Sequence, residues 1–135
     1  MRRLKTRAEF LAVARGARSA RRAFVIQTLA AADPAAEPRC GFTVTKKVGN
    51  AVVRNRVRRR LKEAVRLEAA RLGRPGFDHV VIGRRDGLAQ DFAALRAELV
   101  GAFAQGRKTL SRSQSPEAAA SAASRPSGET PGTVR

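Results

Sequence analysis

The distribution of apolar residues in the first third of the chain predicts one short helix followed by two strands. Residues 7–15 form a short amphipathic run that stops at Gly16, a residue suited to the left-handed position after a helix. Residues 22–31 are rich in β-branched and aromatic side chains, which is typical of a strand. Residues 41–46 alternate between apolar and polar side chains, so a second strand is expected there, half-buried and with an open polar face.

A longer helical pattern lies between residues 51 and 72. Its apolar positions are Val53, Val57, Leu61, Ala64 or Val65, and Leu72. They recur mostly at steps of three and four residues, so they form one face of an amphipathic helix. Asn50 is the expected N-cap of this helix, and Gly73 and Pro75 are expected to end it.

The rest of the pattern predicts one more strand and one more helix before the composition changes. Residues 77–84 are apolar enough to lie inside a sheet, and residues 88–103 repeat apolar positions at helical spacing. Residues 105–135 are rich in Ser, Ala, Pro, Gly and Thr without apolar periodicity, so we expect a disordered tail there. The order of elements predicts an α+β domain over residues 1–104, with helices packed on a small central sheet.

The net charge of the chain indicates what kind of partner it binds. The 135 residues include 28 Lys and Arg against 11 Asp and Glu, which gives a formal net charge of +17 and a pI near 11.9. Such an excess makes the folded state repel itself, and nucleic acid is the partner class it most strongly indicates. A membrane partner is not expected, because no apolar run approaches the roughly 20 residues that span a bilayer.

The lone Cys40 cannot form an intramolecular disulfide, so it is expected to be a strand thiol in a reducing compartment, most simply the cytoplasm. The N-terminus is basic but has no apolar core of an export signal. An organelle presequence is the alternative interpretation of this segment. We favour a mature domain that begins at the N-terminus.

Ten Lys or Arg residues and only two Glu lie between residues 46 and 71. On the predicted helix they form three rows away from the apolar stripe: Arg54, Arg58 and Lys62; Asn55, Arg59 and Arg66; and Arg56 with Arg60. Like charges at this spacing repel by about 0.2–0.5 kcal/mol per pair, so the helix is expected to bind an external polyanion. RNA is favoured over DNA, because the helix follows a strand and the sequence shows no helix-turn-helix, zipper or zinc ligands.

The sequence offers no set of residues suited to catalysis or metal binding. His79 is the only histidine and has no Cys or His partner at ligand spacing. Glu63 and Glu68 are better interpreted as charge partners of nearby arginines than as a catalytic pair. The segment that begins at Gly49 lacks the Gly-Lys-Ser/Thr ending of a phosphate-binding loop.

Residues 41–63 have the sequence GFTVTKKVGNAVVRNRVRRRLKE, with Arg54-Asn55-Arg56 at its centre. This run resembles the signature of the bacterial ribonuclease P protein subunit, and the similarity covers roughly residues 3–103. The resemblance implies a subunit that works with a large catalytic RNA to remove the 5′ leader from precursor tRNA. It also implies that the RNA carries the hydrolysis with Mg²⁺, and that the protein alone binds no cofactor.

The resemblance further implies a fold and a set of site residues. The fold is an α/β sandwich of the ribosomal S5 domain 2-like type, with a left-handed crossover at the basic helix. The resemblance assigns RNA contacts to Lys46, Lys47, Arg54, Asn55, Arg56 and Arg59, and we expect Asn50, Arg58 and Lys62 to bind RNA as well. The implied cleft for the leader contains Phe10, Gln27, Thr43 and Thr45.

Two departures from the family pattern bear on these assignments. Gln27 stands where family members often have an aromatic residue, so the leader is expected to depend less on stacking. Phe10 is the candidate for stacking, although packing within its own helix is an alternative role. Lys62 stands where arginine is common, which keeps the charge but loses the bidentate fork.

Two other function classes remain open from the sequence. The first is a ribosomal or nucleoid-type binding protein without associated catalysis. The second is a stand-alone nuclease.

Overall fold

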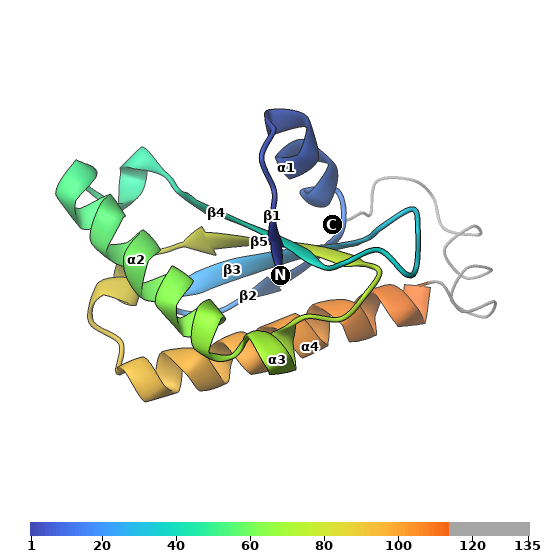
Figure 1. Cartoon of the computed structure of the whole chain (residues 1–135). Coiled ribbons are helices and arrows are strands. Elements are labelled where there is room, and N and C mark those ends of the chain that lie inside the picture. Colours follow the sequence, from blue (N-terminus) through green and yellow to red (C-terminus); the bar gives the residue numbers. More distant parts are fainter. Residues whose placement is uncertain (114–135) are drawn as a thin grey trace, which may run out of the picture.

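The computed structural model describes residues 1–113, with side chains through residue 110 (Figure 1). The elements in chain order are β1 (Arg2–Arg3), α1 (Arg7–Val13), β2 (Ala17–Ala20), β3 (Phe24–Ala30), β4 (Arg39–Val44), the 3-10 helix η1 (Lys46–Val48), α2 (Ala51–Leu67), α3 (Ala69–Leu72), β5 (Phe77–Gly83), the 3-10 helix η2 (Arg85–Leu88) and α4 (Phe92–Ser113). The helices and strands predicted from the hydrophobic pattern are all present. The α+β class is therefore confirmed.

The described strands form one mixed sheet with the order β1-β4-β5-β3-β2. β4 pairs in parallel with both β1 and β5, whereas β3 is antiparallel to β5 and to β2. Since β4 and β5 are parallel neighbours, the chain between them must cross over, and it does so through α2 and α3. The hand of this crossover stays a prediction.

The helices lie on both faces of the sheet. Figure 1 shows α2, α3 and α4 on one face and α1 on the other. α4 packs on β2 and β3, α2 packs on β4 and β5, and α1 contacts β3 and β5. The basic helix is thus held by its inner side, and among the described helices only α1 lies on the opposite face of the sheet.

The main core fills the space between the sheet and the larger helices. Val57, Leu61, Ala64 and Val65 of α2 are buried there, as the apolar stripe predicts. They meet Leu95, Leu99, Ala102 and Phe103 of α4 and Phe24, Ile26 and Val81 of the sheet. Each fully buried Leu or Phe contributes roughly 1.5–3 kcal/mol, so this layer fixes the orientation of α2.

The helix predicted to run to Leu72 is interrupted at Glu68. This residue ends α2 and begins α3, with φ −105° and ψ 13°, outside the helical region. Its buried carboxylate accepts a hydrogen bond from Arg96 Nε at 2.6 Å and lies 3.8 Å from Arg71 Nε. An ion pair with α4 therefore holds the break, which the helical periodicity of α2 does not indicate.

The helix predicted over residues 88–103 begins later and ends later than expected. Leu88 belongs to η2, and α4 starts at Phe92, where Asp91 Oδ2 accepts a hydrogen bond from the Ala94 backbone N at 3.1 Å. At the other end α4 continues to Ser113. The helix boundaries predicted from apolar spacing alone were wrong at both ends.

α4 continues past residue 104, where the sequence pattern placed the end of the domain. Gly106 is buried against Thr28, and Arg107 Nη1 donates a hydrogen bond to the Leu72 carbonyl at 2.8 Å. These contacts attach the additional turns of α4 to the sheet and to α3. Residues 114–135 of the tail expected over residues 105–135 lie outside the described residues.

Candidate nucleic-acid interface

The connection from β4 into α2 places two lysines beside a helix N-terminus. After η1 the chain turns at Gly49, whose φ of 157° suits glycine. Asn50 then caps α2, because its Oδ1 accepts a hydrogen bond from Val53 N at 3.0 Å, which confirms the predicted N-cap. Lys46 and Lys47 are exposed just before this cap. The positive end of the helix dipole therefore adds to the charge of both side chains.

The side of α2 away from the core carries the remaining predicted RNA-binding residues. Asn55, Arg56, Arg59 and Lys62 are exposed, whereas Arg54 and Arg58 are half-buried. Asn55 Oδ1 accepts a hydrogen bond from Arg58 Nη1 at 3.0 Å, which links two adjacent turns of the surface. Burial of the apolar stripe thus leaves a dense cationic surface pointing outward.

Arg60 does not belong to that surface, although it lies in one of the three rows inferred from helical spacing. Its Nη1 donates a hydrogen bond to the Gly87 carbonyl at 3.0 Å, and its Nη2 donates one to the Gln90 carbonyl at 2.6 Å. It also lies 5.7 Å from the centre of the Phe92 ring. Arg60 therefore joins α2 to η2 and to the start of α4, and its charge is directed into the protein.

Arg60→Ala is expected to lower the free energy of unfolding by roughly 1–2 kcal/mol, because charge-assisted hydrogen bonds to backbone carbonyls are lost. The adjacent exposed residue supplies a matched control. Arg59→Ala should change stability by less than about 0.5 kcal/mol and weaken RNA binding more than Arg60→Ala does. Urea denaturation and RNA titration of both variants check this, and equal losses of stability would contradict it.

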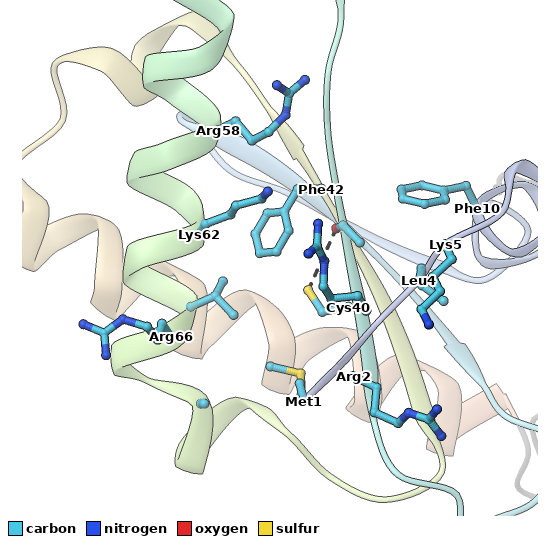
Figure 2. A pocket seen from close by; sticks show the side chains of 14 residues that line it. Met1, Arg2, Leu4, Lys5, Phe10, Cys40, Phe42, Arg58, Lys62 and Arg66 are labelled. Carbon is cyan, nitrogen blue, oxygen red and sulfur yellow. Dashed lines mark hydrogen bonds between the residues drawn. The ribbon is translucent and has the colours of Figure 1, made fainter.

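A cationic groove extends from α2 to the N-terminal strand (Figure 2). Its volume is about 710 Å³, and Cys40, Gly41 and Phe42 of β4 form its floor. The cations that line it are Arg2, Arg3 and Lys5 near β1, and Arg58, Lys62 and Arg66 on α2. None of the described lining residues is acidic. Lys62 Nζ lies 5.9 Å from the centre of the Phe42 ring, so charge and an apolar surface are adjacent.

The N-terminal wall of this groove was not predicted from the sequence. Arg2 and Arg3 form β1, a strand of two residues that has no alternating pattern. It forms by parallel pairing with Arg39 and Cys40, and Arg2 N donates a hydrogen bond to the Pro38 carbonyl at 2.9 Å. The basic N-terminus was a visible signal of charge, but its place opposite α2 depends on that distant pairing.

Three of the four residues implied for the leader cleft lie on the face that carries α1. The Phe10 ring covers Gly41 so closely that a Cβ there would lie 2.5 Å from Phe10 Cζ. Thr43 lies two residues after Gly41 and therefore on the same face of β4. Val80 of β5 pairs with Gly41 on one side and with Gln27 of β3 on the other, so Gln27 shares this face. Thr45 is exposed beyond the end of β4. The binding roles of all four residues stay predictions.

Two residues with reactive side chains are buried in the core. Burial raises the pKa of the Cys40 thiol to about 12, so the thiol is neutral. Burial, with a smaller contribution from the Arg107 cation, lowers the pKa of His79 to about 3. The neutral imidazole shares a hydrogen bond with Thr28 Oγ1 at 3.0 Å and lies 4.2 Å from the Phe103 ring centre.

The carboxylates near the interface are paired with arginines, as the sequence predicts. Glu63 and Arg66 form a bidentate ion pair, and the hydrogen bond from Arg66 lowers the pKa of Glu63. In the described part of the chain, no three His, Cys, Asp or Glu side chains come together in a way that could hold a metal ion. Within the same residues, no helix is long and apolar enough to cross a bilayer.

Known proteins resemble this chain in sequence and in structure. The family model described as Ribonuclease P matches residues 1–106. The chain is 45% identical over 105 residues to the ribonuclease P protein component of Erythrobacter litoralis, covering 78% of this chain and 85% of that protein. It is 54% identical over 100 residues to the component from Gluconacetobacter diazotrophicus, covering 72% and 84% of the two chains.

Two solved structures share the same fold. The RNase P protein from Thermotoga maritima matches with a TM-score of 0.66 and 27% identity, over 78% of this chain and 97% of that one. The Staphylococcus aureus RNase P protein matches with a TM-score of 0.60 and 25% identity, over 82% and 95%. With the family model spanning the sheet, the basic helix and most of α4, this chain belongs to the ribonuclease P protein family.

Proposed function

We propose that this chain is the protein component of ribonuclease P, and that it binds the catalytic RNA through the outward side of α2. The observation that carries the proposal is the exposed cationic surface of α2, which joins the groove beside β1. Arginine and lysine on a rigid helix suit the phosphates of a folded RNA, because shape and backbone charge are what a protein can read there.

The second RNA that this proposal assigns to the protein is the substrate, precursor tRNA. Its single-stranded 5′ leader would lie on the sheet face beside Phe10, with Thr43 and Gln27 as polar neighbours. Phe10 is half-buried, so part of its ring remains available to a base. An aromatic ring and polar side chains on a sheet suit single-stranded RNA without strict sequence preference.

The residues near this interface suit RNA binding by the protein and leave the chemical step to the RNA subunit. Its carboxylates are held in ion pairs, and its thiol and imidazole are neutral and buried. We propose that the protein holds both RNAs and binds no cofactor itself, while Mg²⁺ acts through the RNA subunit. Cys40 is free and buried, and we propose the cytoplasm as the compartment.

Binding to two RNAs of equal length tests this proposal against a general nucleic-acid binder. One is a bacterial ribonuclease P RNA and the other is a structured RNA of unrelated sequence, both at physiological salt. We expect at least tenfold tighter binding to ribonuclease P RNA. Equal affinity for both RNAs would contradict the assignment, because a ribosomal or nucleoid-type protein using only charge would give that result.

A further inference from the structure

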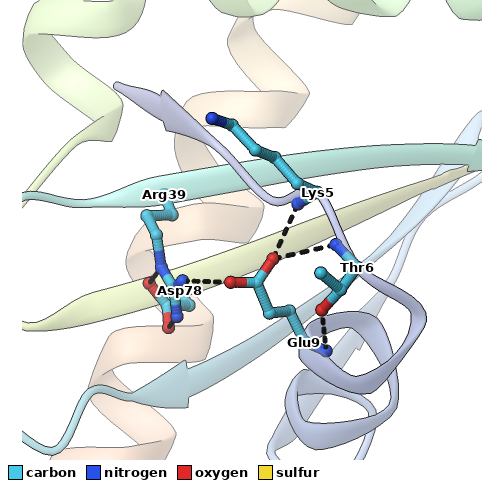
Figure 3. Close-up of polar contacts among 5 residues, drawn as sticks. All are labelled: Lys5, Thr6, Glu9, Arg39 and Asp78. Atoms are coloured by element: carbon cyan, nitrogen blue, oxygen red, sulfur yellow. Dashed lines mark hydrogen bonds and ion pairs between the residues drawn. The ribbon is translucent and has the colours of Figure 1, made fainter.

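Glu9 connects the start of α1 to the sheet through both of its carboxylate oxygens (Figure 3). Oε1 accepts hydrogen bonds from the backbone N of Lys5 at 2.7 Å and of Thr6 at 2.9 Å. Thr6 Oγ1 in turn accepts one from Glu9 N at 3.2 Å, which completes a capping box. Oε2 is left to accept a hydrogen bond from Arg39 Nη1 at 2.7 Å.

Arg39 is itself fixed inside the sheet. It lies on β4 in register with Asp78 on β5, and its Nε and Nη2 donate to the two oxygens of Asp78 at 3.1 Å and 2.8 Å. The Asp78 side chain is only 6% exposed. This bidentate pair fixes the plane of the guanidinium, so that Nη1 points at Glu9 in one defined direction (Figure 3).

Strand β4, whose Arg39 binds Glu9, also contacts the Phe10 ring. Arg39 and Gly41 are two residues apart on β4, so they share a face of the sheet. Arg39 binds Glu9, and Gly41 lies under the ring of Phe10, the next residue of α1. Two neighbouring residues of the helix thus contact two neighbouring positions of one strand face.

Apolar packing alone does not set the orientation of α1. The helix has seven residues, too few to be stable in isolation, and it packs on the sheet mainly through Val13 and Phe10, beside Leu4. Apolar contacts are not directional, whereas charge-assisted hydrogen bonds are. The contact between Glu9 and Arg39 is therefore a directional link between α1 itself and the sheet.

We propose that Glu9 and Arg39 are positioning residues for the leader cleft: their ion pair sets the orientation of α1 and thereby the place of the Phe10 ring above Gly41. This inference rests on the proposed role of Phe10 in leader binding. Asp78 acts one step further away by fixing Arg39. Glu9, Arg39 and Asp78 do not line the cationic groove beside α2, whereas the Phe10 ring does.

Glu9→Gln tests the proposal without removing the cap of α1. The amide oxygen can still accept the hydrogen bonds from Lys5 and Thr6, whereas the charge that pairs with Arg39 is lost. With the complete ribonucleoprotein, we expect KM for a precursor with a long leader to rise about three- to tenfold and kcat to stay within about twofold. KM for a precursor with a single-nucleotide leader should not change. Arg39→Lys, which keeps the charge but loses the fork, should act in the same direction.

A double-mutant cycle separates positioning from general stability. In a Phe10→Ala background, Glu9→Gln should add no further effect on the long-leader KM, because the group that it positions is gone. Glu63→Gln is the matched control, since it removes the same charge from another ion pair on an exposed helix surface. It should change the KM of both substrates equally or not at all. Equal increases for both substrates with Glu9→Gln, or full additivity with Phe10→Ala, would overturn the proposal.

NMR of the isolated protein tests the positioning of the Phe10 ring without any RNA. The Gly41 α-protons lie under the Phe10 ring and report its position through their NMR shifts. Glu9→Gln should move these shifts toward the values seen in Phe10→Ala, and Glu63→Gln should leave them in place. Unmoved shifts in Glu9→Gln would overturn the positioning role. Moved shifts with an unchanged leader dependence would support positioning and contradict the leader role of Phe10, so the two failures can be told apart.

Discussion

Replacing Arg54 and Arg56 together with Ala is expected to weaken binding of ribonuclease P RNA by roughly tenfold or more at physiological salt. Arg56 is exposed and Arg54 is half-buried near the N-terminus of α2, where the helix dipole and Lys46 and Lys47 add to the same positive potential. Each guanidinium that contacts a phosphate releases counterions from the RNA when it binds. The slope of log affinity against log salt should therefore become less steep by about one unit per lost contact, or about two in total.

Titration at several salt concentrations measures both quantities in one experiment. Arg71→Ala with Arg74→Ala is the matched control, because it removes the same charge from exposed positions beyond the end of α2. The control should change the slope much less, and neither pair should change stability by more than about 1 kcal/mol. A salt slope that stays the same in the Arg54 and Arg56 variant would contradict direct phosphate contacts at these residues.

Acidification from pH 7 to pH 5 is expected to lower the free energy of unfolding by about 2 kcal/mol through His79 alone. The pKa of this imidazole is about 3 in the folded protein and about 6.5 when the chain is unfolded. The unfolded state therefore binds a proton first. The stabilisation is present above pH 6.5 and is lost as the pH falls toward 3, by about 1.4 kcal/mol per unit across most of this range.

Urea denaturation at several pH values between 7 and 5 checks this effect. Backbone hydrogen bonds from Lys5 and Thr6 lower the pKa of Glu9, and the hydrogen bond from Arg66 lowers the pKa of Glu63, so both carboxyls stay ionised in the folded protein throughout this window. His79→Gln keeps a polar partner for Thr28 but has no group that titrates in this range. Its stability should be nearly constant over the window. A wild-type protein whose stability is also constant there would contradict the burial of a neutral His79.

The parts of the fold that depend on local sequence were predicted correctly. The apolar stripe of α2 and its cap at Asn50 need only residues within one helix, and both are confirmed. The alternation predicted over residues 41–46 is confirmed for the same reason, because Val44 belongs to the main core and Phe42 packs against it. Local periodicity thus determined which side of α2 would be left for charge.

Features that depend on distant pairing could not be predicted in this way. β2 pairs with β3, and its four residues carry two charged or polar side chains without an apolar run of their own. The role of Arg60 depends on carbonyls about 30 residues further along the chain, which no helical spacing reveals. The extra length of α4 likewise depends on Gly106, whose small size allows the helix to approach Thr28.

The candidate site was predicted in two different ways. Exposure of Arg56 and Arg59 followed from the helix pattern, so the outward cationic side of α2 could be predicted from local sequence. The grouping of Phe10, Gln27 and Thr43 came from the resemblance, because nothing in local sequence brings α1, β3 and β4 to one face. The link between Glu9, Arg39 and Asp78 was not predicted, since it joins three elements through side chains alone.

Cleavage of precursor tRNA at low Mg²⁺ tests most directly whether this protein holds an RNA that cuts. Bacterial ribonuclease P RNA and precursor tRNA would be mixed with and without the purified protein, and release of the 5′ leader would be measured over time. We expect cleavage to be faster with the protein present, and no cleavage by the protein in the absence of the catalytic RNA. Cleavage no faster than with the RNA alone, or cleavage by the protein without any RNA, would contradict the account.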